Sequence, residues 1–125
     1  MQFIVNHFYI FLSISFGVAS QLIIKWKMSS VTVPDTSIFD KFTFAFMMLF
    51  NPYIILSIIL TLLAGLSWMI AMTKFEISYA YPFTLLGLIF VTFFSVLFFG
   101  ESITTQKIIG ILFVLIGIFI ISRSM

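Results

Sequence analysis

Four long apolar stretches dominate the sequence, at about residues 8–26, 53–73, 79–99 and 105–122. None of the four contains an acidic residue. A helix rises about 1.5 Å per residue, so roughly 20 apolar residues cross a hydrocarbon core about 30 Å thick. We therefore expect each stretch to form a transmembrane helix.

The composition supports a membrane location. Hydrophobic residues make up 62% of the 125 residues and charged residues only 8%, whereas soluble domains are about 25% charged. A small soluble domain of this composition would expose large apolar patches to water. The predicted fold class is therefore all-α, an integral membrane four-transmembrane-helix bundle that forms a single membrane domain over residues 1–125.

The lengths of the connections constrain the arrangement of the helices. The connections on either side of the third stretch are only about five residues long, which makes the joined helices antiparallel neighbours. The region between the first two stretches, residues 28–50, is longer. Its apolar part, about 38–50, forms either an interfacial helix or an extension of the second span, and the sequence leaves both interpretations open.

The sequence offers no constellation of catalytic or metal-binding residues. Cysteine is absent, and the single histidine, His7, has no partner nearby in the sequence. Neither a Gly-rich phosphate loop nor a Ser/His/Asp set is present. We therefore predict that the protein is not an enzyme and needs neither a metal nor a cofactor.

The cationic residues are unevenly divided between the two predicted membrane faces. One face carries Lys25, Lys27, Lys41 and Lys107, and the other carries Lys74 and Arg123. By the positive-inside rule this bias favours both termini outside. Because the bias is small, it also permits insertion in both orientations, so that one gene could make an antiparallel pair.

Four helices fill their own centre with side chains, so a solute path requires a second subunit. Transporters commonly build their site between inverted repeats, and here the second repeat would be another chain. Gly110 and Gly117 are seven residues apart on one face of the fourth helix, where a partner backbone could approach. The alternative is packing within the chain. We expect an antiparallel dimer, either a homodimer or a heterodimer with a homologous small membrane protein.

Several motifs resemble a known family. Ala80-Tyr81-Pro82, the Gly100-Glu101 turn and the spacing of Gly110 and Gly117 are similar to the carboxy-terminal half of small, EamA-like members of the drug/metabolite transporter superfamily. Relatives include the small multidrug resistance proteins and the subunits that flip undecaprenyl-phosphate-aminoarabinose. The resemblance covers the chain except the longer loop at 28–50. It implies a multi-pass protein of the bacterial cytoplasmic (inner) membrane.

The sequence of the first helix distinguishes the branches of this superfamily. Multidrug members carry a glutamate eight residues before a lysine that looks equivalent to Lys25, and here that position is Gly17. Without the carboxylate, proton-coupled exchange of cationic drugs loses its central group. The run from Val18 to Leu22 instead resembles the aminoarabinose-lipid flippase subunits.

The resemblance therefore implies a transporter subunit that moves a polyprenyl-phosphate-linked sugar or a similar membrane lipid between leaflets. Two alternatives remain open. One is export of a small metabolite or drug by another member of the superfamily, and the other is a non-transporting membrane assembly subunit.

Two polar residues of the first helix are candidate substrate ligands. Gln21 can hydrogen-bond a sugar hydroxyl, or it can bond a neighbouring helix as buried amides in membranes do. Lys25 can meet a phosphate as a point charge, or its ammonium can reach the interface while its stem stays in the bilayer.

The remaining candidates flank the third helix. Glu76 and Glu101 can meet a cationic amino sugar near each face, or pair with Lys74 or Lys107 in the loops. Trp68, Tyr79 and Tyr81 can face a cavity or anchor the helices at the interface.

Overall fold

The computed structural model describes residues 2–33 and 35–124, and these residues form helices and no strand. In chain order the elements are α1 (Gln2–Met28), α2 (Ile38–Met48), α3 (Pro52–Ala71), α4 (Ile77–Ala80), the 3-10 helix η1 (Tyr81–Leu85), α5 (Leu86–Phe99) and α6 (Thr105–Ser122). Four segments are long and apolar enough to cross a membrane: Ile4–Met28, Pro52–Ala71, Ile77–Phe99 and Thr105–Ser122. The all-α class with four candidate spans is thus confirmed.

Side-chain caps define where two of the spans begin. The Asn51 side chain accepts a hydrogen bond from the backbone N–H of Tyr53, and Pro52 occupies the first helical position, where its missing N–H costs nothing. Thr104 caps α6 by accepting from the N–H of Lys107. Because of these caps, α3 and α6 begin where the second and fourth apolar stretches begin.

The third span is not a uniform α-helix. It begins as α4, tightens into η1 and continues as α5. Pro82 lies in η1, where its ring and its missing N–H are tolerated better than in the middle of an α-helix. A tighter segment within a span is a common position for a hinge.

The long connection contains a helix of its own. Ser37 caps α2 by accepting from the N–H of Asp40, and none of the α2 residues is buried. Residues 49–51 form a turn that separates α2 from α3. Residues 38–48 are therefore a distinct helix rather than a continuation of the second span.

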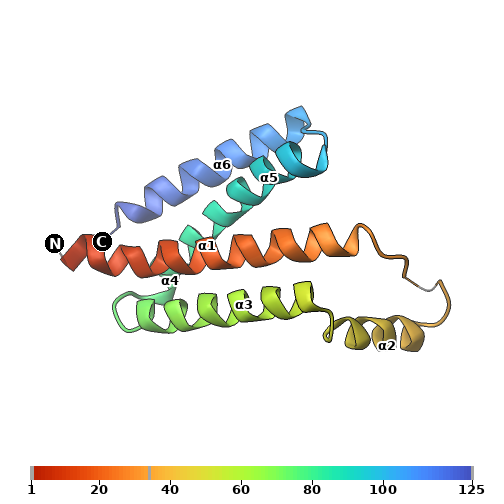
Figure 1. Cartoon of the computed structure of the whole chain (residues 1–125). Coiled ribbons are helices and arrows are strands. Elements are labelled where there is room, and N and C mark those ends of the chain that lie inside the picture. Colours follow the sequence, from red (N-terminus) through yellow and green to blue (C-terminus); the bar gives the residue numbers. More distant parts are fainter. Residues whose placement is uncertain (1, 34, 125) are drawn as a thin grey trace.

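The helices pack unequally (Figure 1). α1 lies along α3 and also contacts α5 and η1, whereas α6 contacts η1. Both chain termini lie at one end of the molecule, and the α5–α6 turn lies at the other. The buried core joins α1 to the last residue of α3, to the start of the third span and to one residue of α6: Ile10, Ile14, Val18, Ala71, Tyr79, Ala80, Phe83 and Ile118.

Hydroxyl groups join α1 to α3. Ser20 is 1% exposed, and its Oγ donates to the Ser57 carbonyl oxygen at 2.8 Å. Ser13 Oγ donates to the Ala64 carbonyl oxygen, also at 2.8 Å. Small residues let the two backbones approach, and interhelical hydrogen bonds then hold them in a membrane.

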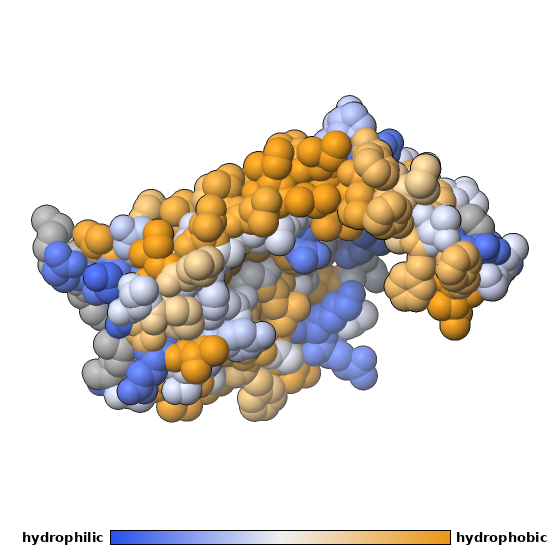
Figure 2. Space-filling view, turned by 90° about the horizontal axis from the view of Figure 1, so that it is seen from below, coloured by the Kyte–Doolittle hydropathy of each residue, from blue (hydrophilic) through white to orange (hydrophobic). Residues whose placement is uncertain are grey.

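Most of the remaining surface is apolar. Figure 2 shows a band of hydrophobic residues along the molecule, with hydrophilic residues at its ends and in a further group below the middle of the band. In the first span His7, Ile10, Ile14, Val18 and Ser20 are buried, whereas in the last span Ile118 is the one buried residue among those that the structure describes. Of the four candidate spans, α6 is thus the one that the rest of the chain covers least.

Candidate functional site

One side of α1 carries small and polar residues at regular intervals. Ser13, Gly17, Gln21 and Lys25 follow one another at four-residue steps, which places them along the same side of a helix. The first three line a cleft of about 470 Å³ between α1, α3 and the third span. Clefts that bind small ligands are typically about 300–1,000 Å³.

One polar side chain of the cleft, that of Gln21, forms no hydrogen bond with the described part of the chain. Ser13 is committed to the Ala64 carbonyl, whereas Gln21 is exposed and has no hydrogen-bond partner within residues 2–33 and 35–124. At Gly17 an added Cβ would meet no atom within 4 Å. The glycine therefore leaves the cleft open beside the Gln21 amide.

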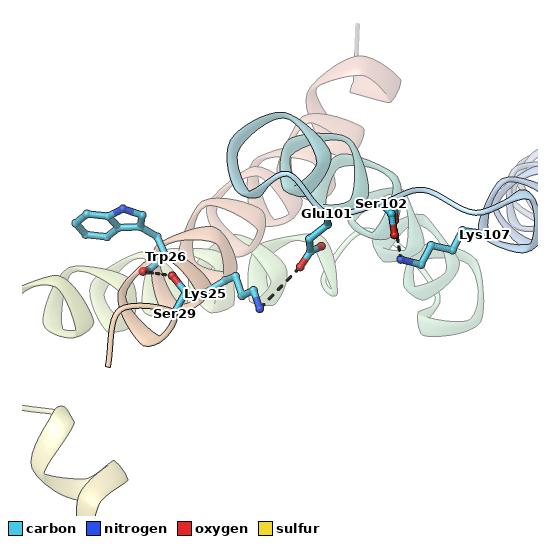
Figure 3. A network of polar contacts seen from close by, with 6 residues as sticks. All are labelled: Lys25, Trp26, Ser29, Glu101, Ser102 and Lys107. Atoms are coloured by element: carbon cyan, nitrogen blue, oxygen red, sulfur yellow. Dashed lines mark hydrogen bonds and ion pairs between the residues drawn. The ribbon is translucent and has the colours of Figure 1, made fainter. Parts of the chain in front are cut away.

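An ion pair lies one helical turn beyond Gln21. Lys25 Nζ is 3.8 Å from Glu101 Oε1, and their side chains are 54% and 43% exposed (Figure 3). Gly100 ends α5 with a left-handed backbone (φ 66°), which a glycine adopts without strain, and the following loop brings Glu101 toward α1. The structure thus joins Lys25 and Glu101, which are far apart in the sequence.

Lys107, one of the alternative partners considered for Glu101, is engaged elsewhere. Its Nζ donates to the Ser102 carbonyl oxygen at 3.2 Å (Figure 3). Glu101 and Lys107 also line a second cleft, of about 390 Å³, between α5 and α6. Glu101 therefore borders this second cleft while it contacts Lys25 beside the first.

The other candidates lie apart from this pair. The rings of Trp68 and Tyr81 meet edge to face, with centroids 6.1 Å apart, where the end of α3 meets η1. Glu76 precedes α4, is exposed and forms no ion pair within the described part of the chain. The structure gathers Gln21, Lys25 and Glu101 and leaves Trp68, Tyr81 and Glu76 outside that group.

The predicted interface glycines have open surroundings. A Cβ built at Gly110 or at Gly117 would meet no other atom within 4 Å. Gly110 lines the cleft between α5 and α6. Neither glycine is therefore needed for close packing inside the chain.

The sequence did not predict one buried polar pair. His7 Nε2 lies 2.9 Å from the Tyr79 hydroxyl oxygen, across 72 residues of sequence. No local spacing connects these residues. The available signal was the single histidine of the chain, which directly precedes the first predicted apolar stretch.

Comparisons with known proteins give one finding. The sequence profile of the EamA-like transporter family matches residues 8–123. No curated protein and no solved structure gives a significant match.

Proposed function

Because the chain belongs to the EamA-like transporter family and is thus a membrane transporter of the drug/metabolite superfamily, we propose that it is one subunit of a dimeric lipid flippase. It moves a polyprenyl-phosphate-linked sugar, or a lipid of similar chemistry, between leaflets. The apolar tail stays in the bilayer while the phosphate and the sugar cross along the polar side of α1.

The Lys25–Glu101 pair beside the Gln21 cleft is the observation that carries this proposal. A half-exposed ion pair contributes only about 0–1 kcal/mol, so a ligand can separate it at little cost. The lipid phosphate then meets Lys25 as a point charge, while Glu101 is free to accept hydrogen bonds from an amino sugar. Gln21, one turn deeper, offers an amide to the sugar hydroxyls.

The surroundings of these residues fit a lipid better than a free cation. Apart from Ser13 and Thr84, apolar residues provide the rest of the cleft wall around Gln21, among them Val18, Leu88 and Val91. The four acidic residues of the chain, Asp35, Asp40, Glu76 and Glu101, lie outside all four candidate spans. A cation that entered the membrane region would meet no carboxylate there.

The open surroundings of Gly110 and Gly117, together with the low burial of α6, support a dimer across this helix. Backbones approach closely where glycines replace larger residues. A second copy, or a homologous small membrane protein, then supplies the other half of the transport path.

Reconstitution tests the proposal directly. Purified protein is placed in liposomes, alone and with any homologous small membrane protein encoded beside it, and a labelled polyprenyl-phosphate-linked amino sugar is followed between leaflets. We expect protein-dependent movement of this lipid and no uptake of a lipophilic drug cation such as tetraphenylphosphonium. Cation uptake without lipid movement would identify a multidrug-type exporter, and movement of neither would contradict the flippase proposal.

A further inference from the structure

The His7–Tyr79 pair joins the N-terminal part of α1 to the short helix α4. His7 belongs to the first span and Tyr79 to the third, and their side chains are only 8% and 4% exposed. Histidine is the side chain that ordinarily changes its charge between about pH 5 and pH 8. Titratable groups inside membrane spans are costly, and they commonly mark ion and proton pathways.

Aromatic rings surround the imidazole. The centroid of the Phe75 ring is 4.7 Å from that of His7, and the centroid of Phe83 is 6.1 Å away. Both rings meet the imidazole edge to face. Edge-to-face contacts of this kind are a favoured packing of aromatic rings, so they hold the imidazole in one orientation beside Tyr79.

The pair also borders a pocket of its own, of about 430 Å³, which gives a proton a route to the imidazole. α1, the start of the third span and the end of α6 form its walls: Ile4, His7, Phe8, Phe11, Tyr79, Phe83 and Ser122. Among these residues His7 and Tyr79 are the two that titrate. α6 contributes the neutral Ser122 to this wall and η1 contributes the neutral Phe83.

One short element connects this pocket with the Gln21 cleft. Phe83 and Thr84 are consecutive residues of η1, and Phe83 lines the His7 pocket while Thr84 lines the cleft. A movement of η1 that follows a change at Tyr79 would therefore alter both cavities. The 3-10 geometry of η1, inside an otherwise α-helical span, favours such a movement.

We propose that His7 and Tyr79 form the proton-binding site that couples transport through the Gln21 cleft to a pH gradient. Water in the pocket delivers a proton to the neutral imidazole, which becomes an imidazolium with an N–H on each ring nitrogen. In the imidazolium, Nε2–H donates to the Tyr79 oxygen, so in this state the phenol O–H cannot donate to Nε2. Loss of the proton to water on the opposite side of the membrane restores the first state.

This inference rests on the proposed transport function, so the experiment separates the two. Lipid movement is measured in proteoliposomes with and without an imposed pH gradient. One pH unit corresponds to about tenfold accumulation per coupled proton. We expect His7→Gln to equilibrate the labelled lipid but to lose the gradient-driven accumulation, whereas Tyr9→Phe, which removes a phenol from the same helix, retains it.

Two outcomes would overturn the inference and leave the flippase proposal standing. One is undiminished accumulation by the His7→Gln variant. The other is wild-type transport that does not respond to the gradient.

A second measurement applies even if no lipid moves. His7 is the only histidine and Tyr79 is one of four tyrosines. NMR spectra of isotope-labelled protein in nanodiscs therefore contain few histidine and tyrosine signals, and the tyrosine signal that disappears in the Tyr79→Phe variant belongs to Tyr79. We expect the Tyr79 ring signals to shift with the same midpoint as the His7 titration, and to stay constant in the His7→Gln variant. Tyr79 signals that do not follow His7, or a His7 that does not titrate between about pH 5 and pH 8, would exclude the proton site.

Discussion

Lys25 Nζ lies 3.8 Å from Glu101 Oε1, so the end of α1 is joined to the loop between α5 and α6 by two opposite charges. The separation is long for a charge-assisted hydrogen bond, which is typically about 2.7–2.9 Å. Both side chains are also about half exposed. The pair is therefore better suited to exchange partners with a charged ligand than to hold the helices together.

Replacing Lys25 tests this assignment. We expect Lys25→Met to weaken the apparent affinity for the lipid-linked sugar by about 10- to 150-fold, because a hydrogen bond to a charged group contributes about 1.5–3 kcal/mol. The unfolding free energy should change by less than about 1 kcal/mol. The measurement is a concentration series in the flipping assay. Lys41→Met is the matched control, since the half-exposed Lys41 also forms an ion pair, with the fully exposed Asp35 in the loop before α2.

Glu101 should govern selectivity rather than activity as a whole. Glu101→Gln removes the competing anion from Lys25, so we expect a polyprenyl phosphate without a sugar to bind more tightly than it does to the wild type. An amino-sugar lipid should bind several-fold less tightly, because its ammonium loses its carboxylate. Competition between the two lipids in one assay measures both effects. Parallel changes for both lipids would show that Glu101 does not contact the amino group.

The hydroxyl contacts between α1 and α3 should contribute to stability. Ser20→Ala removes a buried hydrogen bond to the Ser57 carbonyl, and such interhelical bonds contribute about 0.6–1.7 kcal/mol. We expect the free energy of unfolding to fall by about 1 kcal/mol, measured by steric trapping in bicelles. Ser15→Ala is the control, because Ser15 donates to the Phe11 carbonyl of its own helix at an exposed position. Equal losses for both variants would contradict the packing role of Ser20.

The spans were predictable because the apolar stretches and the bilayer thickness together determine helix number and length. The Asn51-Pro52 and Thr104 caps were also visible in the sequence, since capping depends on neighbouring residues. The division of the third span into three helical segments was not predicted. A proline near the start of a span can be absorbed in the first turn or can bend the helix, and which of these occurs at Pro82 depends on how η1 packs against α1 and α6.

The sequence was sufficient to name the residues of the candidate site, but it did not predict that Lys25 and Glu101 contact each other. Gln21 and Lys25 lie four residues apart, so their common side of α1 follows from helix geometry. The approach of Glu101 to Lys25 depends instead on the tertiary arrangement of α1 and α5 and on the left-handed turn at Gly100. His7 and Tyr79 meet for the same kind of reason, across two spans with no shared sequence pattern.

The dimer can be tested at α6 without disturbing the fold of one chain. An added side chain at Gly110 meets open space within the chain, so Gly110→Leu should leave the monomer folded and, by holding the partner helix away, shift the protein toward monomers. Gly65→Leu is the matched control on α3, because Gly65 is equally open. Native mass spectrometry and cross-linking in nanodiscs report the oligomeric state. A Gly110→Leu protein that remains as dimeric as Gly65→Leu would place the contact on another helix.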